Sequence, residues 1–175
     1  MTIREATADD IEGLSRVAKA SWDADYPDIL TSESLRDGFE EWYSESQVRE
    51  SLNWANTLIL VAEKAGTIAG FAHAVWERDE SGETATTDTS GDILRVYVHP
   101  EYRREGLGQQ LFEKTRDELT RRGVSRLRAM TLEANDVGNE FYRQLDFELV
   151  DTEQVSIGDE SYRENTYAMD LETAN

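Results

Sequence analysis

The chain has 175 residues, 38% of them hydrophobic, so we expect one domain over residues 1–175 with a packed core. Its formal net charge of −19 argues against binding to nucleic acid or to an anionic membrane surface, because both need a basic surface. The absence of Cys excludes disulfides, thiolate nucleophiles and Cys-ligated zinc, and two His residues are too few for a His-rich metal site.

The acidic composition has two interpretations. One is an ordinary acidic protein, and the other, which we favour, is a salt-adapted (halophilic) one whose carboxylates keep the surface hydrated while salt screens their repulsion. Apolar runs such as 58–62 are too short to span a membrane, and the N-terminus lacks a signal-peptide pattern. We therefore expect a cytoplasmic protein.

The first third of the chain predicts one strand followed by helices. A strand is expected over 2–6, and Thr7 with Asp10 marks the start of a helix that ends near Tyr26-Pro27. From Ser32 onward the apolar spacing predicts either one helix broken near Ser44 or two helices.

The rest of the chain alternates between strands and helices. We expect a hairpin of strands 57–66 and 67–78, a mobile hairpin loop over 79–92 and a strand over 92–98. After these come a helix over 106–123, a strand over 125–134, a helix over 135–145 and strands over 147–157 and 161–172. The order β-αα-βββ-α-β-α-ββ predicts an α+β sheet with helices on its faces.

One short segment between a strand and a long helix is suited to binding a polyphosphate. Residues 103–108 read R-x-x-G-x-G, which is neither a Walker A loop nor G-x-G-x-x-G. Glycines let a phosphate approach the backbone, the amides at a helix N-terminus favour anions, and Arg103 and Arg104 add charge-assisted hydrogen bonds. Alternatively the two arginines are plain surface charge, and one of the pair is expected to point away from the phosphates.

Residues 92–150 resemble the core of the GNAT N-acetyltransferase superfamily. The segment L-R-V-Y-V-H-P-E-Y-R-R-E-G-L-G, over 94–108, is similar to its acetyl-CoA-binding signature, and N-x-x-G-x-x-F-Y-x-x-L-x-F, over 135–147, to its second motif. Gly138 stands where the family usually has Ala, and Asp146 where Gly usually precedes the Phe. The resemblance implies an α/β three-layer sandwich: a mixed, mostly antiparallel sheet of about seven strands flanked by about four helices.

The resemblance also implies acetyl-CoA as co-substrate, direct transfer of the acetyl group to an amine, and no metal. The main chain at Val96–Val98 would pair with the pantetheine arm, and a bulge or divergence there would aim an amide at the thioester carbonyl. Asn135 would contact the pantetheine or cap the last helix. The expected cofactor-binding residues are Val96, Tyr97, Val98, Arg103, Arg104, Glu105, Gly106, Leu107, Gly108, Gln109, Asn135 and Tyr142.

The resemblance also points to residues with catalytic roles. Tyr142 would protonate the departing thiolate, unless it is simply an aromatic core residue beside Phe141. Asp92 is the first candidate for the general base and His73 the second, although His73 fits a hydrogen-bonded sheet residue better. Glu77 is a distant third, and His99 is expected to be a loop residue.

The amine acceptor is expected between 20–55, 67–78 and 150–170. The surrounding acidic residues suggest a cationic acceptor: a polyamine, an aminoglycoside-like amine, an amino-acid amine or a protein N-terminus. A noncatalytic acyl-CoA sensor on the same fold is the main alternative, an ATP-binding protein is disfavoured by the missing Walker Lys, and a homodimer is possible. The aromatic residues that would line the acceptor site or belong to the core are Trp22, Tyr26, Trp42, Trp54 and Trp76.

Overall fold

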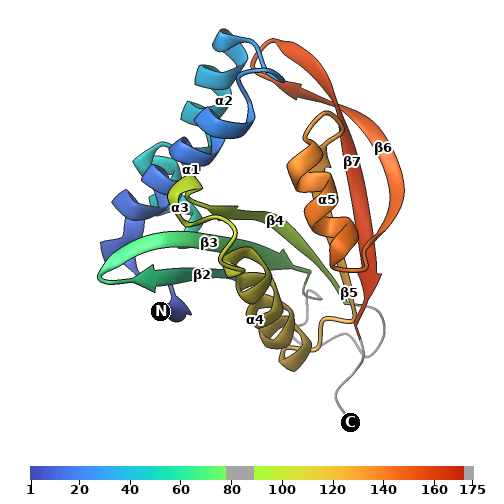
Figure 1. Cartoon of the computed structure of the whole chain (residues 1–175). Helices are drawn as coiled ribbons and strands as arrows, with labels where there is room; N and C mark the ends of the chain where they lie inside the picture. Colours follow the sequence, from blue (N-terminus) through green and yellow to red (C-terminus); the bar gives the residue numbers. More distant parts are fainter. Residues whose placement is uncertain (78–88, 172–175) are drawn as a thin grey trace.

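A seven-stranded sheet in the order β1-β2-β3-β4-β5-β7-β6 runs through the molecule (Figure 1). The computed structural model describes residues 1–77 and 89–171. Neighbouring strands are antiparallel except β4 and β5, which are parallel. The strands are β1 (Thr2–Glu5), β2 (Thr57–Lys64), β3 (Thr67–Trp76), β4 (Ser90–Val98), β5 (Arg126–Leu132), β6 (Glu148–Ile157) and β7 (Glu160–Asp170).

Five α-helices lie in the described part of the chain: α1 (Ile11–Asp25), α2 (Ser32–Tyr43), α3 (Glu45–Ser51), α4 (Leu107–Arg121) and α5 (Asp136–Gln144). The alternative left open after Ser32 is settled as two helices, because Ser44 takes an extended ψ of 154° and its hydroxyl caps α3. This break gives five helices where about four were expected. None of the helices in the described ranges is long and apolar enough to cross a membrane.

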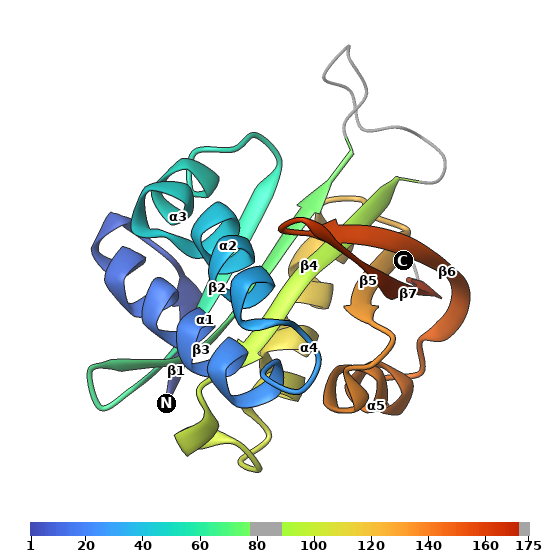
Figure 2. The ribbon, with the colours of Figure 1, turned by 90° about the horizontal axis from the view of Figure 1, so that it is seen from above.

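The alternation of side chains along β2 places helices on both faces of the sheet. Ile59 and Val61 pack in the cluster that contains α1, whereas Leu58 and Leu60 pack with Leu111 of α4 on the other face. Figure 2 shows α1, α2 and α3 on one side of the sheet and α4 on the other. Helix α5 joins the α4 side, where Phe112, Tyr142 and other buried side chains form one cluster. The predicted three-layer, mostly antiparallel architecture is confirmed.

Strand β4 begins earlier than expected. It starts at Ser90 instead of residue 92, and it pairs with β3 along most of its length. The mobile loop predicted over 79–92 lies mostly outside the described residues.

Strands β1 and β6 are the two edges of the sheet. A homodimer stays a prediction.

Two parallel strands diverge at the centre of the sheet. β4 and β5 pair over only four residues each, Ser90–Ile93 with Arg126–Ala129. Beyond that point β5 continues beside β7 and β4 beside β3, so an opening forms between them (Figure 1). This opening positions the site.

Candidate active site

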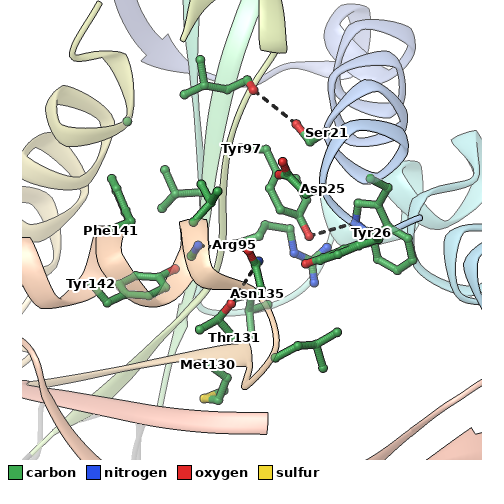
Figure 3. Close-up of a pocket in the computed structure, with 18 of the residues that line it drawn as sticks. Ser21, Asp25, Tyr26, Arg95, Tyr97, Met130, Thr131, Asn135, Phe141 and Tyr142 are labelled. Carbon is green, nitrogen blue, oxygen red and sulfur yellow. Dashed lines mark hydrogen bonds between the residues drawn. The ribbon is translucent and has the colours of Figure 1, made fainter. Parts of the chain in front are cut away.

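A pocket of about 850 Å³ occupies the opening between β4 and β5, a size typical of small-molecule sites (Figure 3). One end is lined by the loop before α4 and by α5. The other end is lined by α1, α2 and the β6–β7 hairpin. A single pocket therefore joins the phosphate-binding segment expected from the sequence to the expected acceptor region.

A β-bulge in β4 determines which side chains face each helical layer. His73 pairs with Arg95 but Ala74 pairs with Ile93, so Leu94 is the extra residue. Leu94 lines the pocket. The resemblance implied a bulge or a divergence near Val96–Val98; the structure has the divergence there and the bulge at Leu94.

The bulge reverses the alternation of the strand. Val96 and Val98 pack toward α4, whereas Tyr97 packs in the cluster of α1 and α2. Asp92 lies on the face of β4 opposite to that of Ile93, which is buried against α4. Strict alternation along β4 would place Asp92 on the same face as Val96 and Val98, and the extra residue at Leu94 puts it on the other face.

The two adjacent arginines differ in their contacts. Arg103 forms a bidentate ion pair with Asp25, its Nη1 and Nη2 each 2.8 Å from a carboxylate oxygen, and its Nε donates to the Val98 carbonyl. Arg104 is exposed and has a left-handed backbone with φ of 68°. Arg103 therefore fixes the loop to the end of α1, and Arg104 is the arginine directed to solvent.

The N-terminus of α4 is open to an anion. Gly106 is the N-cap, with a φ of 78° that favours glycine, and no side chain caps the helix. The next amides, at Leu107, Gly108 and Gln109, lack helical acceptors, as in any first turn. The first turn contains no acidic residue. The macrodipole and these amides favour negative charge here.

Gly108 allows α4 to lie close to α5. A Cβ at this position would come within 3.1 Å of the Phe141 ring and 3.7 Å of Val98 Cγ2. Any larger residue at 108 would fill the space between the start of α4, β4 and α5.

Tyr142 reaches the pocket from α5 (Figure 3). Its ring packs edge-on against Phe147 and Phe141 and beside Tyr167. Burial, with a contribution from Tyr97, raises the pKa of Tyr142 above its ordinary value. Because its pKa is raised, the hydroxyl is protonated at neutral pH. Within the described residues nothing hydrogen-bonds to it, so it is available as a donor.

Aromatic side chains form the wall opposite α5. The Tyr97 hydroxyl accepts from Trp22 Nε1 at 3.0 Å and from the Tyr43 hydroxyl at 3.1 Å. Tyr26 is also buried here, and burial raises its pKa. Of the five aromatic residues expected in the acceptor region or the core, Trp22, Tyr26 and Trp42 line the pocket, and Trp54 and Trp76 do not.

The acetyltransferase (GNAT) family model matches residues 28–147, which is more than half of the chain. The chain belongs to the GNAT family of N-acetyltransferases. It is 26% identical over 155 residues to a spermidine N(1)-acetyltransferase of Thermoplasma acidophilum, covering 86% of this chain and 90% of that protein. An acetyltransferase of Yersinia pestis is 32% identical over 108 residues, covering 62% of this chain and 70% of that one.

A crystal structure of the PaiA N-acetyltransferase from Thermoplasma acidophilum, in complex with coenzyme A, superposes with a TM-score of 0.75. The two chains are 25% identical, and the match covers 95% of this chain and 98% of that one. The acetyl-CoA expected from the sequence fits the residues of this GNAT chain. A long, anionic thioester would follow a continuous path here. The path runs from the open amides at the start of α4, past the space kept by Gly108, to the unpaired edge of β4.

The structure explains both departures of the second GNAT motif from the family pattern. A Cβ at Gly138 would lie 2.5 Å from Thr131 Oγ1 and 2.8 Å from Asn135 Nδ2, so Ala does not fit beside Thr131. Asp146 has a left-handed φ of 68°, which Asp tolerates better than most residues. Asn135 caps α5 by accepting from the Gly138 amide at 3.1 Å, and it also lines the pocket.

Asn139 is a buried residue that supports the site from outside the pocket lining, and the sequence interpretation did not identify it. Its Oδ1 accepts from Asn165 and from the Tyr167 hydroxyl, and its Nδ2 donates to three carbonyl groups between the end of β5 and the N-cap of α5. These bonds hold α5 to β5 and β7 on the far side of the opening. Its spacing from Asn135, one helical turn, is the only signal in the sequence.

The first and second candidates for the general base, Asp92 and His73, lie outside the pocket lining. Asp92 is paired with Arg128, with Oδ1 2.9 Å from Nε. His73 is buried, stacks on Trp54, and shares a hydrogen bond of 2.7 Å with Thr57. Burial, and then the charge of Arg95, lowers the pKa of His73 to about 3. These placements, and the absence of Glu77 from the lining, weigh against a base role for any of the three.

Two charged pocket residues were also missed. Glu164, on β7, is half-buried, and burial followed by the charge of Glu153 raises the pKa of its carboxyl. Arg95, on β4, lies with its guanidinium over the Tyr43 ring, 4.7 Å from the centroid. In the described ranges no group of three or more His, Asp and Glu residues is arranged to hold a metal ion.

Proposed function

We propose that the acetyl transfer to a primary amine takes place in the pocket between β4 and β5. The observation that carries this proposal is the divergence of the two strands, which brings the start of α4, the Tyr142 hydroxyl and the aromatic wall to one continuous pocket. Acetyl-CoA supplies the activated acetyl group as a thioester. This chain's residues bind it, position the amine and move the protons.

The pyrophosphate is assigned to the start of α4. The amides of Gly106, Leu107, Gly108 and Gln109 point from the open helix end, and Arg104 adds a charge. Arg103 acts indirectly, by holding the loop through Asp25. Glu105 pairs with Lys64 at 2.8 Å, so we assign it to the loop and not to the phosphates.

The pantetheine arm is assigned to the edge of β4 that β5 leaves unpaired. Val96–Val98 would bond to it through the main chain, as if to an added strand. Asn135 lies across the opening, at the start of α5. An amide turned outward by the bulge at Leu94 would stabilise the negative charge that develops on the carbonyl oxygen.

The proton transfers are assigned to Glu164 and Tyr142. The acceptor must lose one proton before its nitrogen attacks and a second after the C–N bond forms, while the C–S bond breaks. Glu164 and Asp25 are the carboxylates that line the pocket in the described part of the chain, and Asp25 is held by Arg103. Glu164 therefore takes the first proton. Tyr142 protonates the sulfur and regains a proton from the nitrogen.

The strongly negative charge also leads us to propose a salt-rich cytoplasm as the working environment. The test of function is accordingly made in buffers with and without molar KCl. Purified protein is incubated with acetyl-CoA and a panel of primary amines, and both free thiol and acetylated amine are measured. Equimolar release of thiol and acetylated amine supports the proposal. Tight acetyl-CoA binding with no acetylated product would favour the noncatalytic sensor.

A further inference from the structure

Arg95 places a positive charge in the acceptor half of the pocket. It follows the bulge directly, and its side chain lies with Tyr97 on the face covered by α1 and α2 (Figure 3). Its guanidinium stacks over the buried ring of Tyr43. The position is therefore fixed by β4 and by an aromatic ring, unlike that of a mobile surface arginine.

Arg95 has no carboxylate partner within the described ranges of the chain. Its Nε is buried and lacks any hydrogen-bond acceptor there. By contrast, Arg103, the other half-buried arginine of the pocket, holds Asp25 through two hydrogen bonds. A buried donor without an acceptor costs free energy, and this chain has 37 acidic residues from which to supply one. Because Arg95 lines the pocket, a ligand bound there can supply an acceptor to the guanidinium.

The pyrophosphate is not that ligand. Arg95 is three residues before Val98, so the two are roughly 10 Å apart along the strand. The start of α4 is next to Val98, since a Cβ on Gly108 would contact its side chain. Arg95 stacks on Tyr43, which belongs to the cluster of α1 and α2, so it projects from the opposite face to Val96 and Val98. It faces the acceptor, not the phosphates.

We infer that Arg95 binds a carboxylate of the acceptor, and that the acceptors are amino acids or similar amines that carry a carboxylate near the amino group. This inference rests on the proposed function. The planar guanidinium matches a carboxylate with two parallel hydrogen bonds. Glu164 is then available for the ammonium, and the aromatic wall for an apolar side chain. A polyamine would instead place another cation beside Arg95.

The test compares acceptors that differ only by the carboxylate. Initial rates of thiol release are measured with phenylalanine and phenethylamine, lysine and 1,5-diaminopentane, methionine and its decarboxylated amine, and spermidine. The variants are Arg95→Gln, Arg95→Lys and, as a control, Arg126→Gln, an exposed arginine at the far end of β5 that pairs with Asp170. Acetyl-CoA binding to each protein is measured separately by titration.

For at least one pair we expect kcat/KM to favour the amino acid by about 10- to 100-fold, the range of a charge-assisted hydrogen bond. Arg95→Gln should abolish that preference, mainly by raising KM for the amino acid, with acetyl-CoA affinity unchanged. Arg95→Lys should retain part of the preference, and Arg126→Gln all of it.

The inference is overturned if the carboxylate-free amines or spermidine are preferred, or if Arg95→Gln leaves the preference intact. Should no acceptor of either kind react, binding of N-acetyl amino acids and matched N-acetyl amines to the CoA complex is measured by thermal shift. Equal binding, or none, also overturns the inference. Failure to bind acetyl-CoA at all would contradict the proposed function instead.

Discussion

Arg103 and Asp25 join the loop before α4 to the C-terminal end of α1, through two hydrogen bonds of 2.8 Å. Asp25 and the Arg103 side chain are 18% and 31% exposed, so the pair is largely shielded from solvent. The arginine that precedes the glycine turn by three residues is therefore a structural residue of the loop. Its neighbour Arg104 is exposed, and it is the arginine that we propose for the ligand.

The two arginines should consequently respond differently to substitution. Arg103→Gln should lower the free energy of unfolding by about 1–2 kcal/mol, because a half-buried carboxylate loses charge-assisted hydrogen bonds. Arg104→Gln should leave stability within about 0.5 kcal/mol and weaken acetyl-CoA binding, since an exposed charge directed to the ligand is lost. Urea denaturation and acetyl-CoA titration of both variants check this. The reverse pattern would mean that the roles are exchanged.

Removal of one hydroxyl group tests the proton donor. Tyr142→Phe should lower kcat by about 10²- to 10⁴-fold, the usual contribution of a general acid. Its effect on acetyl-CoA affinity should be small, because the ring keeps its contacts with Phe147 and Tyr167. Since the pKa of Tyr142 is raised, its ionisation should not limit kcat below pH 10. An unchanged kcat would show that Tyr142 is only an aromatic core residue.

Gly138 offers a test of the close packing between α5 and β5. Gly138→Ala should destabilise the protein by about 1–3 kcal/mol, because the new Cβ would overlap Thr131 Oγ1. The double variant Gly138→Ala with Thr131→Ala should recover part of that loss. Thermal unfolding of the two single variants and the double variant gives the coupling between the sites. Simple additivity would contradict the steric explanation.

His73 should make stability depend on pH. Its pKa is about 3 in the folded protein, against an ordinary value of 6.5, mainly because of burial. Between these values the unfolded chain binds a proton that the folded chain does not, so stability is full above pH 6.5 and falls as the pH is lowered. From pH 7 to pH 5 the wild type should lose about 1–2 kcal/mol more than His73→Gln, by urea denaturation. Parallel pH profiles would show that the pKa of His73 is not lowered in the folded protein.

The local patterns of this sequence predicted much of the fold. The glycine turn, the N-cap at Asn135 and the turn between the last two strands depend on neighbouring residues, and each appears where it was expected. The break at Ser44 was one of two open alternatives. Choosing between one broken helix and two helices required the packing of α2 and α3, which the spacing of apolar residues does not specify.

The base and the acceptor residues were harder to predict, for a physical reason. The single bulge at Leu94 reverses which face of β4 each later side chain occupies, and no local signal in the sequence marks it. Without the bulge, Asp92 would lie on the face of Val96. With it, Asp92 meets Arg128 across the parallel pairing with β5, and Arg95 enters the pocket. Such cross-strand partners depend on register, which is a long-range property.

The most direct test of the account is an equilibrium stability measurement with acetyl-CoA on the wild type and on Gly108→Trp, with ATP as the control ligand. At ~100 times the dissociation constant, a ligand adds about 2.7 kcal/mol to the free energy of unfolding. We expect this from acetyl-CoA with the wild type, none from ATP, and none with a folded Gly108→Trp protein, whose indole would fill the space beside Phe141. Equal stabilisation of the variant by acetyl-CoA would contradict the assignment of the pocket between β4 and β5.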